Sequence, residues 1–158
     1  MAKTLRLTVS DRIGDALFMV LLRAGVKIGT MSLLTVRGRK SGQPHTVPVL
    51  LVERDGERFL VAPYGVVQWV RNIRVAGTAT LTRGRHSETI SVTELPAQDA
   101  APILKQYLVK ATAARSYFEA TINSPLEDFE REAIRHPVFQ ITTVKEPTRQ
   151  ERSTKETE

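Results

Sequence analysis

The chain has 158 residues, 41% hydrophobic and 25% charged, so it is long enough for one globular domain and too short for two ordinary ones. It contains no cysteine, which excludes disulfide frameworks, thiolate metal sites and cysteine nucleophiles. Its 23 Lys and Arg against 17 Asp and Glu leave a net charge of +6, which favours an anionic partner: nucleic acid, lipid headgroups, or a small molecule that carries phosphate or carboxylate.

The N-terminal part of the chain predicts a flexible segment over residues 1–9 and then a helix from Ser10 to about Arg23. The apolar run of this helix, residues 16–22, is too short for a bilayer, which needs about 20 residues. No small-residue cleavage site of a signal peptide follows it. We therefore expect a cytoplasmic protein without a transmembrane segment, with peripheral membrane contact through this first helix left as an alternative.

The next part of the chain predicts short strands joined by tight turns. Alternating apolar residues indicate strands over residues 32–37, 46–53 and 58–62, and Asp55-Gly56 between the last two predicts a two-residue hairpin turn. Pro48 cannot donate to a ladder, so it marks an edge, a strand start or a bulge. A helix is predicted over residues 66–75, followed by strands over 78–83 and 87–95 joined at Gly84.

The C-terminal part predicts helices, one more strand and a polar tail. Asp99 is a predicted N-cap of a long helix whose apolar face includes Leu104, Leu108 and Phe118, with Pro102 in its first turn. A shorter helix over 126–135 and a last strand over 137–144 follow. Residues 145–158 hold no apolar side chain, so we predict a disordered tail.

These elements predict a single domain over residues 10–144. Strands linked by short loops pair antiparallel, and helices between the hairpins lie at the periphery. The fold class is therefore mainly β with added helices: a six-stranded antiparallel barrel rather than a doubly wound sheet.

The usual catalytic motifs are missing from the sequence. His45, His86 and His136 stand far apart, and we find none with a second His or a carboxylate at ligand spacing on one helix, so no metal site is predicted. The chain also lacks the phosphate-binding loop order, the dinucleotide-binding glycines and the serine nucleophile elbow. We infer that any chemistry depends on an organic cofactor.

Two segments carry candidate binding groups. The first runs Gly38-Arg39-Lys40-Ser41-Gly42-Gln43-Pro44-His45, in which a guanidinium, an ammonium and a hydroxyl suit a phosphate; a solvated basic hairpin is the alternative. The second runs Val61-Ala62-Pro63-Tyr64-Gly65 and continues into a helix with Gln68, Trp69 and Asn72. Small residues at a strand end admit a flat ring, and a helix N-terminus presents free N–H groups. Trp69 is equally well a core anchor of its helix.

The order of these segments resembles the deazaflavin-dependent nitroreductase family. The resemblance rests on Leu33-Leu34-Thr35-x-x-Gly38-Arg39-Lys40-Ser41-Gly42-Gln43-Pro44-x-x-x-Pro48, on Asp55-Gly56, on Ala62, on Trp69-x-x-Asn72 and on the closing Pro137-Val138-Phe139-x-Ile141-Thr142. It implies a split β-barrel like that of pyridoxamine-phosphate oxidases. It also implies binding of coenzyme F-420, an 8-hydroxy-5-deazaflavin with a phosphodiester and an oligoglutamate tail. The activity implied is transfer of a hydride to a quinone, an activated alkene or a nitroaromatic.

The resemblance also assigns site residues. Matching positions imply cofactor contacts from Arg39, Lys40, Ser41, His45, Ala62, Tyr64, Gln68, Trp69 and Asn72. His45 stands where most members have a second basic residue, so its contact is weaker and pH-dependent. Tyr64 replaces the Ser and Lys donors that members often have after this strand. Tyr107 and Tyr117 are the tyrosines available near the acceptor, and Tyr117 is the candidate proton donor.

Three alternatives to this function stay open from the sequence. One is an FMN-dependent reductase, and another is a flavin or tetrapyrrole carrier on the same barrel without turnover. A third, a nucleic-acid binder, follows from charge alone, and no recognised motif supports it. Barrels of this type often pair, so a homodimer is kept open as an expectation.

Overall fold

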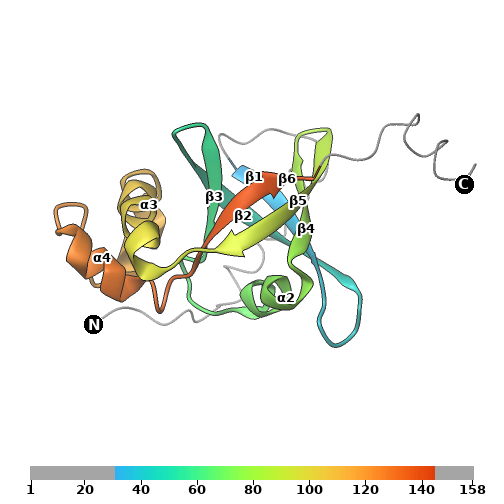
Figure 1. The fold of residues 1–158 in the computed structure, drawn as a ribbon, viewed down its shortest axis with the longest axis horizontal. Coiled ribbons are helices and arrows are strands. Elements are labelled where there is room, and N and C mark those ends of the chain that lie inside the picture. The colour runs from blue at the N-terminus through green and yellow to red at the C-terminus, as the bar shows by residue number, and fades with distance from the viewer. Residues whose placement is uncertain (1–30, 145–158) are drawn as a thin grey trace, which may run out of the picture.

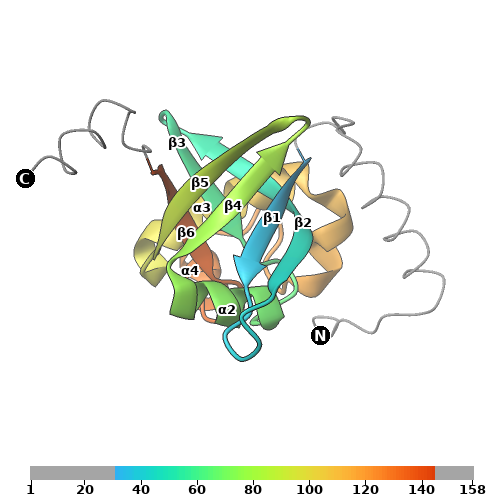
Figure 2. The same cartoon turned by 90° about the vertical axis from the view of Figure 1, so that its right-hand side faces the viewer.

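The computed structural model describes residues 31–144, so the predicted N-terminal helix and polar tail lie outside the described residues. Within this range the strands are β1 (Met31–Arg37), β2 (Pro44–Arg54), β3 (Glu57–Val61), β4 (Thr78–Arg83), β5 (His86–Glu94) and β6 (Val138–Thr143). They close into a barrel in the order β1-β2-β3-β6-β5-β4, and every neighbouring pair is antiparallel (Figures 1 and 2). The predicted six-stranded antiparallel barrel with peripheral helices is confirmed.

Two further predictions from local sequence are also confirmed: the hairpin turn at Asp55-Gly56 and the strand-edge position of Pro48. Asp55 and Gly56 have φ angles of 53° and 76°, the left-handed pair that a two-residue hairpin turn with the twist of its strands requires. Pro48 lies opposite Leu33 of β1, whereas the pairing of β2 with β3 begins only at Leu51. Pro48 therefore stands where β2 has one neighbour, and its missing N–H breaks no ladder bond.

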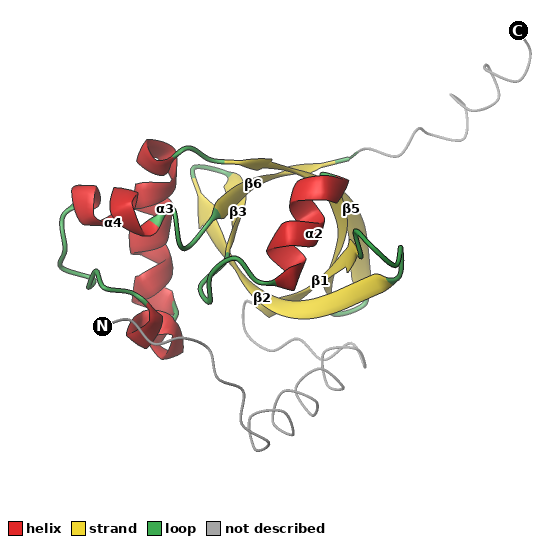
Figure 3. Cartoon of the chain, turned by 90° about the horizontal axis from the view of Figure 1, so that it is seen from below, coloured by secondary structure: helices red, strands yellow, loops and turns green. Residues whose placement is uncertain are grey.

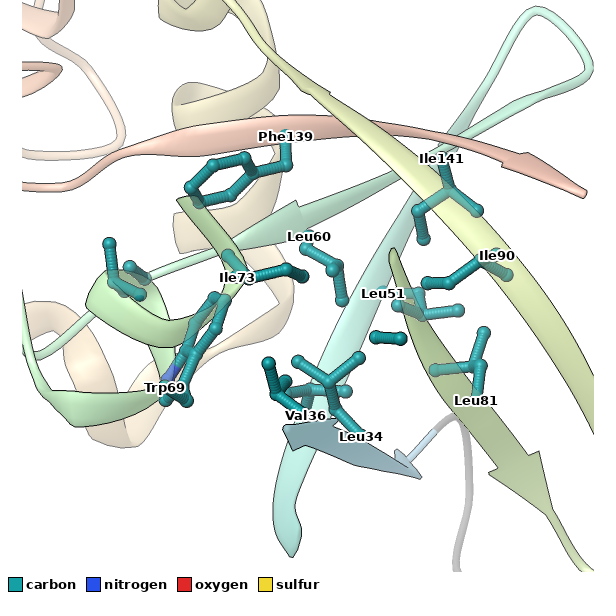
Figure 4. Close-up of a cluster of buried hydrophobic side chains, with 14 residues drawn as sticks. Leu34, Val36, Leu51, Leu60, Trp69, Ile73, Leu81, Ile90, Phe139 and Ile141 are labelled. Carbon is teal, nitrogen blue, oxygen red and sulfur yellow. The ribbon is translucent and has the colours of Figure 1, made fainter. Parts of the chain in front are cut away.

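Helix α2 (Gln68–Ala76) lies across one open end of the barrel (Figure 3). Its buried face carries Trp69, Val70 and Ile73 into the barrel interior, where Trp69 approaches Phe139 of β6 with ring centroids 6.1 Å apart (Figure 4). The strands supply the rest of this core with Leu34, Val36, Val49, Leu51, Leu60, Ala62, Ala79, Leu81, Ile90, Phe139 and Ile141. Burial of these apolar side chains is the main stabilising contribution to the barrel.

A second core joins the barrel to a helical lobe made of α3 (Ala97–Lys110), the 3-10 helix η1 (Thr112–Tyr117) and α4 (Leu126–Glu132) (Figure 1). Its strand residues are Val52, Phe59, Val61 and Val138, which point away from the barrel interior. The lobe covers them with Ala100, Ala101, Ile103, Leu104, Tyr107, Leu108, Ala114, Phe118, Ala120 and Phe129. The β2, β3 and β6 side of the barrel is therefore buried on both faces.

The long helix predicted from Asp99 is wrong at both ends. Helix α3 begins at Ala97, after Pro96 as N-cap, so Asp99 lies inside its first turn and Pro102 further along the helix. At the other end Arg115 donates from Nε to the Leu108 carbonyl at 2.8 Å and from Nη2 to the Val109 carbonyl at 3.2 Å. Because these bonds satisfy carbonyls at the helix end, the chain turns into η1 and Phe118 lies beyond it.

An ion pair lies at the start of β3, where the barrel end opposite α2 is formed. Arg58 donates to Glu88 of β5 and, at 2.8 Å, to the Thr143 hydroxyl of β6. These contacts link three strands at this end, and both charged side chains are part-buried.

Among residues 31–144, no helix has both the length and the apolar composition needed to cross a bilayer.

Candidate coenzyme and acceptor site

The β1–β2 loop is a tight turn held by its own backbone. The Gly38 N–H donates to the Gln43 carbonyl at 2.8 Å, and the Gly42 N–H donates to the Gly38 carbonyl at 2.9 Å. A Cβ on Gly38 would lie 2.9 Å from the Ser41 hydroxyl and 3.0 Å from Nε2 of His45. A larger residue at this position would require the Ser41 and His45 side chains to move, and these are residues in which the sequence predicts an anion site.

Helix α2 holds this loop through Arg39. Nη1 of Arg39 donates at 2.8 Å to the side-chain oxygens of both Gln68 and Asn72, and the Arg39 backbone N–H donates to the same Asn72 oxygen at 3.2 Å. Asn72 is buried and Gln68 is exposed. The structure therefore brings together three of the predicted binding residues, and it gives Gln68 and Asn72 a contact with Arg39 that the sequence did not predict.

The other polar groups of the loop point outward. Lys40 is exposed, and no ion pair is found for it within residues 31–144. The Ser41 hydroxyl accepts the Gln43 N–H at 3.2 Å, so its own hydrogen is left to donate. His45 is exposed in β2 with its ring beside Gly38. These groups can donate to an anion over the loop.

The N-terminus of α2 adds positive potential next to Gln68. Val67 is its N-cap without a side-chain hydrogen bond, and its first turn holds no acidic residue. Free N–H groups at a helix N-terminus favour negative charge, so the helix end and the loop attract the same kind of ligand.

The predicted ring-binding strand end lies just before this helix. Ala62 follows β3, is fully buried, and donates its N–H to the Pro137 carbonyl at 3.0 Å, at the start of β6. Its own carbonyl lies 3.2 Å from Nδ1 of His136. Residues 62–67 then lead to α2, so the strand end and the helix N-terminus are joined by one short segment.

Two tyrosines meet between this segment and the helical lobe. The rings of Tyr64 and Tyr117 are in edge contact, with centroids 4.8 Å apart and an interplanar angle of 78°. Tyr64 is exposed and Tyr117 half-buried. Tyr107 is buried, and that burial, with Tyr64 nearby, raises the pKa of its phenol. Tyr107 therefore stays a neutral core side chain, and Tyr117 is the more exposed of these two tyrosines.

Trp69 lies within the core, with 8% of its side chain exposed. The structure thus agrees with the alternative in which Trp69 anchors its helix in the core. Its contribution to the site is to fix α2, which contacts the loop through Gln68 and Asn72.

The sequence reading of His136 needs a correction. Glu132 stands four residues before His136, and the structure brings its Oε2 to 3.4 Å from Nε2 of the buried ring. The sequence prediction missed this carboxylate, although a spacing of four residues at the end of a predicted helix is the signal that reveals such a pair. Among the described residues, no group of three or more metal-ligating side chains is found.

An antiparallel barrel with a cationic loop, a helix N-terminus and a small-residue strand end fits an oxidoreductase that binds a flavin or deazaflavin with an anionic tail. The chain belongs to the F-420H(2)-dependent quinone reductase family, whose model matches residues 21–126. This confirms the resemblance to the deazaflavin-dependent reductases, and it makes the chain an enzyme that uses reduced coenzyme F-420 as hydride donor to an electron-poor acceptor. The family assigns F-420 rather than FMN as the coenzyme.

Two solved structures with TM-scores above 0.5 support the fold, and a third is reported as similar only. One, described as a domain-swapped dimer, is 19% identical, covers 85% of this chain and 100% of that chain, and has a TM-score of 0.54. The protein Atu2129 of unknown function from Agrobacterium tumefaciens is 14% identical over 90% of this chain and 59% of that one, with a TM-score of 0.52. An F-420-H2 dependent reductase, FDR-A, is 21% identical over 72% of this chain and 94% of that one, with a TM-score of 0.49. No curated protein matches the chain.

Proposed function

We propose that this protein oxidises reduced coenzyme F-420 with a quinone as acceptor. The observation that carries the assignment of the site is the Arg39 guanidinium held between Gln68 and Asn72 on α2, because it fixes the loop with Lys40 and Ser41 at its surface. In this proposal Arg39, Lys40, Ser41 and His45 bind the phosphodiester and acidic tail.

The remaining residues would position the ring system and the acceptor. Ala62 offers a strand end without a bulky side chain, and the rings of Tyr64 and Tyr117 lie in edge contact near it in the chain. When bound, the coenzyme supplies a hydride from C5 of its deazaflavin ring. A quinone that takes this hydride needs one proton to become a hydroquinone, and we assign its delivery to the hydroxyl of Tyr117.

The donor set fits such a coenzyme better than a neutral ligand. Two cations and a helix N-terminus converge on one loop, and the net charge of +6 attracts polyanions from a distance. The predictions of a cytoplasmic location, of a small-molecule acceptor without nucleic acid and of a homodimer stay part of this proposal; the predicted membrane-contacting helix lies outside the described residues.

The test is an anaerobic titration of the full chain with F-420, FMN and FAD, followed by fluorescence, and then by loss of reduced F-420 on addition of the soluble quinone menadione. We expect saturable binding of F-420 but not of FMN or FAD, and oxidation of reduced F-420 that depends on menadione. Saturable binding of FMN instead of F-420 would overturn the coenzyme assignment. Binding without oxidation would make the protein a carrier.

A further inference from the structure

The proposed function gives the buried pair Glu132 and His136 no contact with the coenzyme or the acceptor. Their exposed fractions are 2% and 4%. Burying ionisable groups is costly unless they are partnered, so their partners indicate what the pair holds in place.

Glu132 binds the segment that follows η1. Its Oε1 accepts the backbone N–H of Glu119 at 2.6 Å and that of Ala120 at 2.7 Å. Its Oε2 accepts from Nη2 of Arg135 at 3.2 Å. One carboxylate thus fixes the chain just after Tyr117 to helix α4.

His136 joins the same segment to the barrel. Its ring stacks on Phe118, with centroids 3.8 Å apart and an interplanar angle of 17°. Nδ1 lies 3.2 Å from the Ala62 carbonyl and, because a carbonyl only accepts, Nδ1 carries the hydrogen. Within residues 31–144 no hydrogen-bond partner is found for Nε2, which faces Oε2 of Glu132 at 3.4 Å.

These contacts lie on both sides of the tyrosine pair. Tyr64 is two residues after Ala62, and Tyr117 immediately precedes Phe118. His136 therefore spans from the barrel segment that carries one tyrosine to the lobe segment that carries the other. The contacts of His136 and the contact between the two tyrosine rings thus join the same two segments.

We propose that His136, oriented by Glu132, is a positioning residue that holds Tyr117 of the lobe against Tyr64 of the barrel and so sets the acceptor side of the site. This inference rests on the proposed function for its kinetic consequence. A misplacement of about 1 Å can lower a rate by about a hundredfold, so loss of the span affects turnover of the acceptor. The loop that holds the coenzyme tail is fixed separately, through Asn72.

Two substitutions at His136 distinguish the effect of its hydrogen bond to Ala62 from the effect of its ring stacking on Phe118. His136→Asn places an amide donor near the Nδ1 position, whereas His136→Phe keeps a flat ring against Phe118 and removes the donor to Ala62. We expect His136→Phe to lower kcat/KM for menadione by about tenfold or more. We expect His136→Asn to recover much of that loss. The dissociation constant of F-420 is expected to stay within about twofold of the wild type in both variants.

Two further variants test whether a loss of activity reflects a general loss of stability. Glu88→Gln weakens the part-buried ion pair with Arg58 at the opposite barrel end and is expected to leave kcat/KM unchanged. Glu132→Gln is the second variant of the pair, expected to act in the direction of His136→Phe, and it serves where that variant does not fold.

The ring proton shifts of Tyr64 and Tyr117 give a readout that does not depend on activity. Each ring lies in the ring-current field of the other, so we expect these shifts to change in His136→Phe and Glu132→Gln but not in Glu88→Gln. Unchanged tyrosine shifts and unchanged kcat/KM in both pair variants would overturn the inference. So would an equal loss in Glu88→Gln. A wild type that fails to oxidise reduced F-420 would contradict the proposed function alone, and the shifts would still decide the positioning role.

Discussion

At the residue scale, Lys40 and Arg39 stand side by side in the chain but have different surroundings. Arg39 is held by two side-chain amides of α2, whereas the side chain of Lys40 in the same loop is exposed. A held guanidinium is ready to bind without losing further side-chain entropy, and a mobile ammonium acts as a point charge. We therefore expect Arg39 to contribute geometry and Lys40 to contribute charge.

The prediction for Lys40 is that Lys40→Ala weakens F-420 binding about tenfold, the usual effect of losing one charge-assisted contact. Fluorescence titration measures it. Lys110→Ala is the matched control, since Lys110 is also exposed but lies at the end of α3. Equal weakening in both variants would show that only net charge matters and that the loop is not the site.

A second residue-scale prediction concerns the dependence of stability on pH. Burial lowers the pKa of His136, against the opposing effect of its contacts with the Ala62 and Tyr117 backbone and with Glu132. The unfolded chain therefore binds a proton more readily than the folded one, so the stabilisation is present above the ordinary histidine pKa of about 6.5 and is lost as the pH falls below it. Urea unfolding at pH 5 and pH 8 should show a lower midpoint at pH 5.

The control for this prediction is a comparison of two histidines. His136→Asn should reduce the difference between the two midpoints, whereas His86→Asn, at an exposed position in β5, should leave it unchanged. The same difference in His136→Asn as in the wild type would mean that other groups cause the acid sensitivity.

At the scale of elements, helix α2 connects the core to the site. Its inner face packs Trp69, Val70 and Ile73 into the barrel. Gln68 and Asn72 of the same helix accept hydrogen bonds from Arg39 of the loop. Because the helix is fixed by apolar burial, it can hold the Arg39 side chain, and with it the loop, in a fixed position.

The prediction for this element is that Asn72→Ala weakens F-420 binding several-fold although it removes no charge. The buried amide accepts two bonds from Arg39, and its loss releases the loop. Gln68→Ala removes one bond at an exposed position, so its effect should be less than about twofold. Titration of both variants, with amide hydrogen exchange of residues 38–43, checks the ranking, and a larger effect of Gln68→Ala would contradict it.

The strands were predictable from the sequence because each carries its own alternation, and the Asp55-Gly56 turn depends on two adjacent residues. The end of α3 was not, because it depends on Arg115 reaching carbonyls six and seven residues earlier. The Arg39 loop was found as a motif, but its clamp by Asn72 spans 33 residues of chain. The contact of His136 with Ala62 spans 74 residues, and no local pattern encodes it.

At the scale of the whole molecule, charge and fold act on different parts of the coenzyme. In the proposed function, the net charge of +6 acts over long distances on the phosphodiester and acidic tail, whereas the strand end and the tyrosine pair act by contact on the ring. Salt screens the first effect and leaves the second nearly unchanged, because the screening length falls from about 10 Å at 0.1 M to about 3 Å at 1 M.

We therefore predict that salt separates the two contributions. Raising NaCl from about 0.05 M to about 0.5 M should weaken binding of F-420 several-fold, and it should change binding of a truncated deazaflavin without phosphate and glutamates by less than about twofold. Lys40→Ala should show a smaller salt dependence than the wild type, because the screened contact is already gone. Equal salt dependence for the full and the truncated ligand would mean that the tail does not bind near the cationic loop. The long-range attraction would then act on the protein surface as a whole and not at the site built by Arg39 and α2.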